Sequence, residues 1–530
     1  MATQSILPLG ILVLVSLLAL TKPALADDQV KRSDFPADFY FGTATSSYQV
    51  EGMANKSGRG PNLWDTFTHD YPERIRDGSN GDRAVDFYHQ YKEDLKRMKD
   101  MGFTAFRFSI SWSRILPFGD IRSGINEDGV KFYSDLIDEA HNNGLEPFVT
   151  LFHWSTPQAL EDRYGGFLSR NITVDFRNFV DVCFERYGDR VRYWITLNEP
   201  WAYSAWGYGR GVFAPGRCSS WVNRECRGGD SATEPYIVAH NLLLAHAEAA
   251  NQKGKIGITL VSYWMEPYSN SSIDQDAAKR ALDFMFGWFM DPITYGRYPR
   301  TMRDLVQSRL PYFSETDSEM LKGSIDFLGL NYYSARYVKN VDSVDPNHIS
   351  YTDDARVNLT VVNSEGQSIG PVAGIDWLRV VPYGIRFLLN YTKDTYRPPE
   401  IYITENGVCQ DDTFITIDLI HDRVRIDYYK LHIGNVSIAM KNYSVPVKGY
   451  FAWSFMDNFE WSSGYTKRPV CPAGYIVALN GSGGSGCRMV IYGKEFSPDI
   501  LFDFHAVLAY MVLSSPEPFK RWRNGKARQL

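Results

Sequence analysis

Short runs of apolar and aromatic residues alternate with longer amphipathic stretches along most of this chain. Eight of these runs have the length and composition of buried β-strands. They occupy residues 39–45, 103–109, 147–153, 191–197, 256–262, 326–332, 400–404 and 448–454. The stretches between them have helical periodicity, as at 82–101 and at 129–144, which ends in the helix-stop sequence Asn-Asn-Gly.

Regular alternation of strands and helices predicts an α/β fold with parallel strands. With eight strands, the pattern predicts a single-domain (β/α)8 TIM barrel, a fold that often exceeds the usual domain size. A doubly wound sheet is the alternative, but it favours a glycine-rich phosphate turn after an early strand. Gly58-Arg59-Gly60 does not have the dinucleotide-binding spacing, so the barrel is favoured.

The first 26 residues have the pattern of a secretory signal peptide. Residues 6–20 are mostly apolar, and the small residues Ala24 and Ala26 provide a cleavage site. The run is shorter than a membrane span, and no other stretch is long and apolar enough to cross a bilayer. We therefore expect a secreted or lumenal protein with its barrel domain at 27–468. The apoplast, the vacuole and the endoplasmic reticulum all remain open as the final compartment.

Cysteine and asparagine patterns agree with the secretory route. Cys218 and Cys226 lie close together in a Gly/Ser/Arg-rich segment, which predicts a short disulfide-closed loop in an oxidising compartment. No Cys or His pair has zinc-ligand spacing, so no metal is expected. Eight Asn-x-Ser/Thr sequons predict N-glycosylation. They begin at Asn55, Asn171, Asn270, Asn358, Asn390, Asn435, Asn442 and Asn480.

Composition narrows the class of ligand. The net charge of −6 gives no electrostatic footprint for DNA or RNA, so no nucleic-acid partner is expected. Hydrophobic residues make up 44% of the chain, which excludes disorder over its whole length. The high aromatic content of 15% fits a site that holds a flat, amphipathic ligand such as a sugar ring.

Reactive groups of such barrels lie at the carboxyl ends of the strands. Two of the predicted ends carry an acid, Glu199 and Glu405. Two carboxyl groups that face each other across a barrel mouth can cleave a glycosidic bond, one as a proton donor and the other as an ionised nucleophile. The sequence does not give their separation, which would distinguish retention from inversion.

Several segments resemble the family 1 glycoside hydrolases, and plant β-glucosidases in particular. TLNEP at 196–200 and ITENG at 403–407 resemble the two signature segments of that family. FGTATSSYQVEG at 41–52 and the FRFSISWSRI, FHW, GLNYYS and FAWSFMDNFEWSSGY segments also match, in the same order. The resemblance covers about residues 33–468 and implies the same barrel fold.

The resemblance implies a retaining glucosidase that hydrolyses O-linked β-glucosides and needs no cofactor. Glu199 matches the general acid/base, and Glu405 matches the nucleophile. Thioglucosidases have Gln at the position of Glu199, which favours O-linked substrates here. The implied sugar-binding residues are Gln49, His153, Asn198, Tyr333, Trp453, Glu460 and Trp461; Arg107 and Asn331 support the acids, and Trp377 packs on the aglycone. The natural aglycone and the oligomeric state remain open.

The resemblance stops abruptly, so residues 469–530 form an atypical tail. Pro469 stands where relatives place an aromatic residue, 481–486 is a Gly/Ser-rich linker, and 499–513 is an apolar stretch too short to span a membrane. The tail could come from an altered reading frame, be an added module, or replace the last helix. A chain that lacks this helix could be a catalytically impaired carbohydrate-binding isoform, which is the alternative to an active enzyme.

Overall fold

The computed structural model describes residues 30–250, 254–411, 423–468, 475–477 and 488–490. Several predictions lie outside the described residues. They concern the signal peptide 1–26, Pro469, Asn480, the linker 481–486 and the apolar stretch 499–513.

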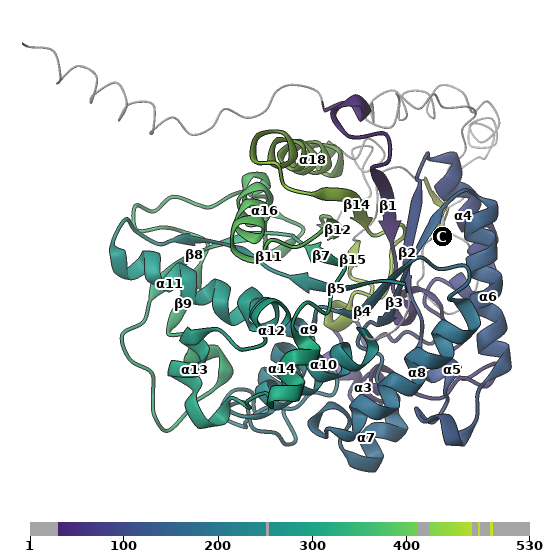
Figure 1. Ribbon diagram of the computed structural model, residues 1–530, viewed down its shortest axis with the longest axis horizontal. Coiled ribbons are helices and arrows are strands. Elements are labelled where there is room, and N and C mark those ends of the chain that lie inside the picture. The colour runs from purple at the N-terminus through teal and green to yellow at the C-terminus, as the bar shows by residue number, and fades with distance from the viewer. Residues whose placement is uncertain (1–29, 251–253, 412–422, 469–474, 478–487, 491–530) are drawn as a thin grey trace, which may run out of the picture.

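Eight parallel strands form a closed barrel, which confirms the predicted fold (Figure 1). Neighbouring strands follow chain order, and the last strand closes the barrel by pairing with the first, with Tyr40 opposite Gly449. The strands are β1 (Tyr40–Ala44), β2 (Ala105–Ser109), β3 (Glu146–Phe152), β4 (Tyr193–Asn198), β5 (Lys255–Val261), β7 (Phe327–Asn331), β12 (Ile401–Asn406) and β14 (Val447–Trp453). Each lies at a predicted run, although β12 extends two residues further than predicted and includes Glu405.

Helices surround the barrel (Figure 1). In α6, for example, Glu127 and Asp128 stabilise the first turn, and one apolar face that includes Leu136 and Ile137 is buried. The α-helices are α2 (Ser47–Val50), α3 (Leu63–Asp70), α4 (Phe87–Asp100), α5 (Trp112–Ile115), α6 (Glu127–Asn142), α7 (Gln158–Tyr164), α8 (Asn171–Tyr187), α9 (Pro200–Ser204), α10 (Glu234–Ala250), α11 (Ser272–Leu282), α12 (Trp288–Tyr295), α13 (Arg300–Val306), α14 (Glu315–Leu321), α15 (Tyr351–Asp354), α16 (Pro382–Tyr396) and α18 (Arg423–Tyr443). None of these helices is long and apolar enough to cross a bilayer.

Aromatic side chains fill the barrel interior. The rings of Phe148 and Tyr193 are stacked with their centroids 4.2 Å apart, and Phe451 packs against Phe148 from another strand. Trp453, the last residue of β14, belongs to the same buried cluster. The barrel is therefore a packed core whose upper surface can serve as the floor of a site.

Small sheets that the strand pattern did not predict extend the molecule beyond the barrel. After β5 and β7, the chain continues at once into β6 (Trp264–Pro267) and β8 (Ala335–Asn340), which pair in parallel. β9 (Val357–Thr360) completes this sheet next to β8 (Figure 1). The remaining pairs are β10 (Val372–Ala373) with β11 (Ile375–Arg379), β13 (Gln410–Asp411) with β15 (Lys467–Arg468), and, within the tail, β16 (Tyr475–Val477) with β17 (Arg488–Val490).

Candidate active site

A cavity of about 570 Å³ opens at the carboxyl ends of the barrel strands. Nine of the predicted site residues line it. They are His153, Asn198, Glu199, Tyr333, Trp377, Glu405, Trp453, Glu460 and Trp461. We call the part formed by these residues, apart from Trp377, the inner wall. Sites at this end of a barrel carry the chemistry of the fold.

Glu405 receives strong hydrogen bonds on both carboxylate oxygens. Arg107 donates from Nη1 to Oε1 at 2.6 Å, and the Tyr333 hydroxyl donates to Oε2 at 2.7 Å. Both Arg107 and Glu405 are almost fully buried, so little water screens this ion pair. A full positive charge and two donors therefore stabilise negative charge on Glu405.

Arg107 connects four strands of the barrel. In addition to Glu405 on β12, it donates to Oδ1 of Asn198 on β4 at 2.6 Å and to Oγ1 of Thr150 on β3 at 3.2 Å. Its side chain comes from β2. Since the guanidinium group has five fixed donors, it can hold these groups in one geometry, which supports its predicted role.

Glu199 lies in the tight turn between β4 and α9. Its φ of +44° is uncommon for a residue other than glycine. Pro200 occupies the first position of α9, where the missing N–H costs nothing and the helical φ is already set. The backbone N–H of Glu199 donates to the carbonyl of Thr259 at 2.9 Å, which helps to hold this strained residue. Such strain is concentrated at functional sites.

The environment of Glu199 favours its protonated form. Burial raises the pKa of Glu199 above its ordinary value, and the negative charge of Glu405 raises it further. The amide of Asn331 opposes this shift by donating to Oε1 of Glu199 at 2.6 Å. Asn331 is also the register partner of Glu405 on the adjacent strand. One side chain thus links the surroundings of both acids, which line the same cavity.

His153 presents an unpaired donor. Nδ2 of Asn198 lies 3.1 Å from Nε2 of His153, so Nε2 accepts and the ring proton belongs on Nδ1. Burial and the nearby charge of Arg107 lower the pKa of His153 well below its ordinary value, which keeps the ring neutral. Nδ1 is buried and has no hydrogen-bond partner. Because buried polar groups are normally paired, this N–H suits a ligand oxygen.

Glu460 and two tryptophans complete the inner wall. Burial and the charge of Glu405 raise the pKa of Glu460 to about 8, and its buried Oε2 lacks a hydrogen-bond partner. The ring of Trp461 packs against that of Trp154, with centroids 4.5 Å apart. Trp453 adds a flat surface beside the two acids. Unpaired polar atoms next to aromatic faces are the features that a sugar ring requires.

The structure does not bring Gln49 to the cavity lining. Its amide group donates to Oδ1 of Asn458 and to the carbonyl of Phe459, both at 3.0 Å, and accepts from the hydroxyl of Ser46. These bonds join α2 to the segment that carries Glu460. Arg107 and Asn331 also lie behind the lining and act through the residues that they contact.

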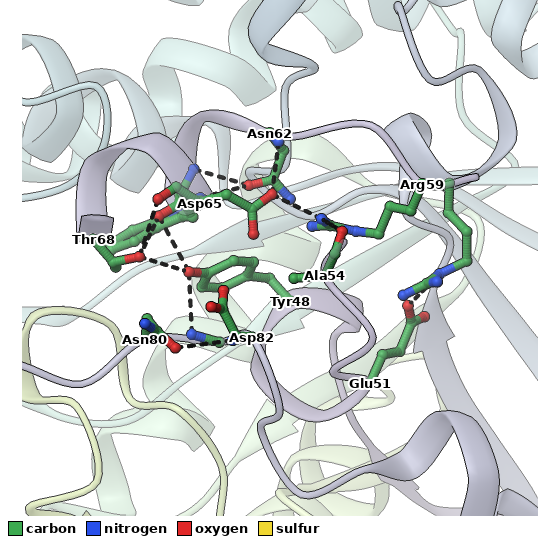
Figure 2. A network of polar contacts seen from close by, with 12 residues as sticks. Tyr48, Glu51, Ala54, Arg59, Asn62, Asp65, Thr68, Asn80 and Asp82 are labelled. Carbon is green, nitrogen blue, oxygen red and sulfur yellow. Dashed lines mark hydrogen bonds and ion pairs between the residues drawn. The ribbon is translucent and has the colours of Figure 1, made fainter. Parts of the chain in front are cut away.

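A polar network connects the α2 segment with α3 (Figure 2). Arg59 forms a buried ion pair with Asp65 at 2.8 Å, and Asp65 and Asn62 cap the start of α3 reciprocally. The hydroxyl of Tyr48, on α2, lies 3.1 Å from that of Thr68 on α3. This network fixes α2 and the following turn relative to α3, and thereby the position of Gln49.

The rest of the cavity lining escaped the sequence analysis, apart from Trp377. We call one part of this remaining lining the outer wall; it is formed by Trp201, Trp206, Arg210, Val212, Phe213, Tyr263, Met285, Arg336, Leu359, Trp377 and Leu378. Most of these residues lie after the carboxyl ends of β4, β5 and β7, in turns, short helices and the small sheets. No periodic pattern marks such segments, so the only signal was their position after a barrel strand.

Cys218 and Cys226 form the predicted disulfide, with their Cα atoms 5.6 Å apart. Of the predicted glycosylation sites, those in the described chain are exposed except for two that are partly buried, Asn390 and Asn435. Asn435 also donates to the carbonyl of Leu431 within α18. Within the described ranges, no group of three or more His, Cys, Asp or Glu side chains could hold a metal ion.

Comparison with known proteins explains this arrangement. The sequence profile described as glycosyl hydrolase family 1 matches residues 31–469. The chain belongs to glycosyl hydrolase family 1. This is a family of retaining glycosidases, so the chain is an O-glycosyl hydrolase, and the predicted family is confirmed.

Individual members of family 1 resemble the chain over most of its length. It is 54% identical to "Beta-glucosidase 24" of Oryza sativa subsp. japonica over 454 residues, which are 84% of this chain and 90% of the relative. It is 52% identical to the raucaffricine-O-beta-D-glucosidase of Rauvolfia serpentina over 473 residues, 83% and 87% of the two chains. A rice β-glucosidase mutant, solved in a covalent complex with glucose, superposes with a TM-score of 0.82 at 43% identity, covering 85% of this chain and 96% of that one.

Proposed function

We propose that this family 1 enzyme is a β-glucosidase that cleaves O-linked β-D-glucosides of small molecules with retention of configuration. The proposal rests on one observation. Two carboxyl groups line the same cavity, and their surroundings favour opposite protonation states. Arg107 and Tyr333 stabilise charge on Glu405, whereas burial favours a proton on Glu199. The covalent glucose complex of the rice relative supports a mechanism with two displacements.

In the first step, Glu405 is the nucleophile. One of its carboxylate oxygens attacks the anomeric carbon, and the bond from this carbon to the leaving oxygen breaks. Glu199 donates its proton to that oxygen, so the aglycone leaves as a neutral alcohol or phenol. The negative charge that held the proton on Glu199 is consumed when Glu405 becomes an ester. The pKa of Glu199 then falls, which prepares it to act as a base.

In the second step, water replaces the aglycone. Glu199 accepts a proton from the water while its oxygen attacks the anomeric carbon, and the bond to Glu405 breaks. Glucose leaves in the β-configuration, and both carboxyl groups regain their starting states. The N–H of His153 and the carboxyl of Glu460 are free to bind sugar hydroxyls, and Trp453 offers a stacking surface.

An aryl β-glucoside with a chromogenic phenol tests this proposal. We expect release of the phenol by the full chain, β-glucose as the first product in ¹H NMR spectra, and loss of turnover in the Glu405→Gln variant. Binding of the glucoside without release would contradict the enzyme and favour the catalytically impaired isoform. Neither the named relatives nor the inner wall, which contains both acids, supports the catalytically impaired isoform.

We further propose that the protein matures in the secretory pathway and carries N-linked glycans. The sequence pattern of residues 1–26, the Cys218–Cys226 disulfide and the exposed sequon asparagines support this. Enzymatic removal of N-glycans should increase electrophoretic mobility, and N-terminal sequencing of the mature protein should begin near residue 27. An unprocessed start and an unchanged mobility would contradict this route.

A further inference from the structure

The outer wall carries positive charge without a carboxylate. All three acids that line the cavity, Glu199, Glu405 and Glu460, belong to the inner wall. The outer wall contributes two arginines, Arg210 and Arg336, among aromatic and aliphatic side chains. The acidic side chains of the cavity thus lie on the inner wall, and two arginines lie on the outer wall.

Arg336 is a buried cation that is paired only with neutral groups. Its side chain is 8% exposed, and its guanidinium lies over the ring of Tyr263, 4.8 Å from the centroid. It donates from Nη1 to Oγ of Ser334 at 3.0 Å and to the carbonyl of Ala335 at 2.7 Å, and from Nη2 to the carbonyl of Trp377. In the part of the chain that the structure describes, no carboxylate forms an ion pair with it. Burial of an uncompensated charge is costly, so such a group suits an anionic partner.

A second and a third arginine increase the local charge. Arg210 is exposed at the cavity and has no carboxylate partner among the described residues. Arg379 does not line the cavity, and its buried Nε and Nη1 have no hydrogen-bond partner. Burial lowers the pKa of Arg336, and the charge of Arg379 lowers it further. Among the described residues, none of these three arginines has a carboxylate partner, and two of them line the cavity. Chance surface exposure does not explain a buried guanidinium group such as that of Arg336.

Tyr263 connects these cations with the leaving-group side of the reaction. Its ring lies 4.8 Å from the Arg336 guanidinium, and Tyr263 lines the cavity together with Arg336, Arg210 and Glu199. If Glu199 protonates the leaving oxygen, as proposed above, the aglycone begins beside Glu199 and extends along the outer wall. Its far end then passes Tyr263 and meets the arginines. Trp377, which is 39% exposed, lies near Tyr263 and offers an apolar surface there.

From this arrangement we infer that the enzyme selects β-glucosides whose aglycone is a flat apolar body bearing a carboxylate or another anionic group, bound by Arg336 and Arg210. The inference rests on the proposed β-glucosidase function, because that function places the sugar at the inner wall and the aglycone along the outer wall. The guanidinium groups supply charge-assisted hydrogen bonds to the anion, and the aromatic side chains cover the apolar body.

Two pairs of aryl glucosides test the inference. The first pair is 4-carboxyphenyl β-D-glucoside and its methyl ester, which have the same shape at the sugar and differ in charge at the far end. We expect the ratio of their kcat/KM values, acid over ester, to fall by about tenfold or more in Arg336→Gln, as charge-assisted contacts predict. A smaller fall is expected in Arg210→Gln, because that side chain is exposed. The difference in leaving-group acidity cancels, because it is the same for every variant.

The second pair consists of the corresponding thioglucosides, which this type of enzyme should bind without cleaving. Their affinities, measured by calorimetry, report on the arginines even if no glucoside is hydrolysed. Failure of the proposed function would therefore appear as absent turnover of both esters and acids, whereas failure of this inference would appear as equal affinity for acid and ester. Affinity of the acid should also fall as the salt concentration rises.

Lys339→Gln is the matched control, since Lys339 is an exposed cation on the same strand as Arg336 but does not line the cavity. We expect its acid-to-ester ratios to equal those of the unmodified enzyme. If Arg336→Gln fails to fold, Arg210→Gln and the salt dependence carry the test. Ratios that stay constant in the folded arginine variants and at all salt concentrations would overturn the inference.

Discussion

The inner and outer walls of the cavity are completed in different ways. On the inner wall Glu405 has a cationic partner, Arg107, behind the lining, and the unpaired atoms include Nδ1 of the neutral His153 and Oε2 of Glu460, whose pKa is raised. On the outer wall the charged groups are guanidinium ions, which have no carboxylate partner within the described ranges. The inner wall is therefore suited to neutral hydroxyls in one fixed geometry. The positive charge of the outer wall is suited to a negative charge on the ligand.

Replacement of the inner-wall nucleophile Glu405 should have the largest effect. Glu405→Gln keeps the shape and an amide oxygen for Arg107 to contact but removes the nucleophile. We expect kcat for an aryl β-glucoside to fall by roughly 10⁴-fold, the scale seen when a covalent catalyst is lost. Circular dichroism should show a folded protein. A folded variant that keeps more than a tenth of the activity would contradict the role of Glu405.

Glu199→Gln should have the next largest effect, and one that depends on the leaving group. The variant cannot donate a proton, so an alkyl glucoside should lose roughly 10²- to 10⁴-fold in kcat/KM. A glucoside of an acidic phenol needs little protonation, so its first step should be affected much less. Comparison of the two substrates measures this difference. An equal loss for both would indicate that Glu199 positions the sugar instead of donating a proton.

The pH profile distinguishes the two inner-wall acids that are held protonated. Both Glu199 and Glu460 have raised pKa values, that of Glu460 at about 8. Since Glu199 acts as an acid in the first step, kcat/KM should fall as the pH rises through its raised pKa. Glu460→Gln should keep this basic limb while weakening binding. If the fall of kcat/KM at high pH disappears in Glu460→Gln, the group that controls it is Glu460.

Removal of the disulfide should have the smallest effect and should act on the outer wall. Cys218 and Cys226 close a short loop that follows Arg210 and Val212 in the chain. Replacing both with Ser should lower the free energy of unfolding by about 2–3 kcal/mol, as expected for a loop of this size. Turnover of a neutral aryl glucoside should change by only a few fold. Thermal melting and kinetics together check this, and a loss as large as that of Glu199→Gln would mean that the two walls are coupled.

The barrel and the inner wall could be predicted because both are tied to the strands. Buried strands appear as apolar runs, and the residues that follow them, such as Glu199, must meet at one end of a closed barrel. His153 follows β3 and Trp453 ends β14, and the family resemblance assigned both to sugar binding. It did not show that Gln49 would direct its amide to Asn458, because partners 409 residues apart in the chain leave no local signal.

The outer wall could not be predicted for a related reason. Arg336 stands on β8, which continues beyond the barrel, and its neighbour Tyr263 lies between β5 and β6. Which way such side chains point depends on the pairing of β6 with β8, which no periodic pattern encodes. Trp377 was found only through the family resemblance. The sequence does not show whether an arginine has a carboxylate partner, because that depends on contacts between distant segments.

The position of Arg107 has a consequence for how the protein is made. Its guanidinium belongs to the second barrel strand, but the carboxylate that neutralises it is 298 residues further along the chain. While the ribosome is still synthesising the intervening segment, this cation has no counterion in the nascent barrel. Catalytic competence and closure of the barrel therefore arise together late in synthesis, and a truncated chain that ends before β12 has neither.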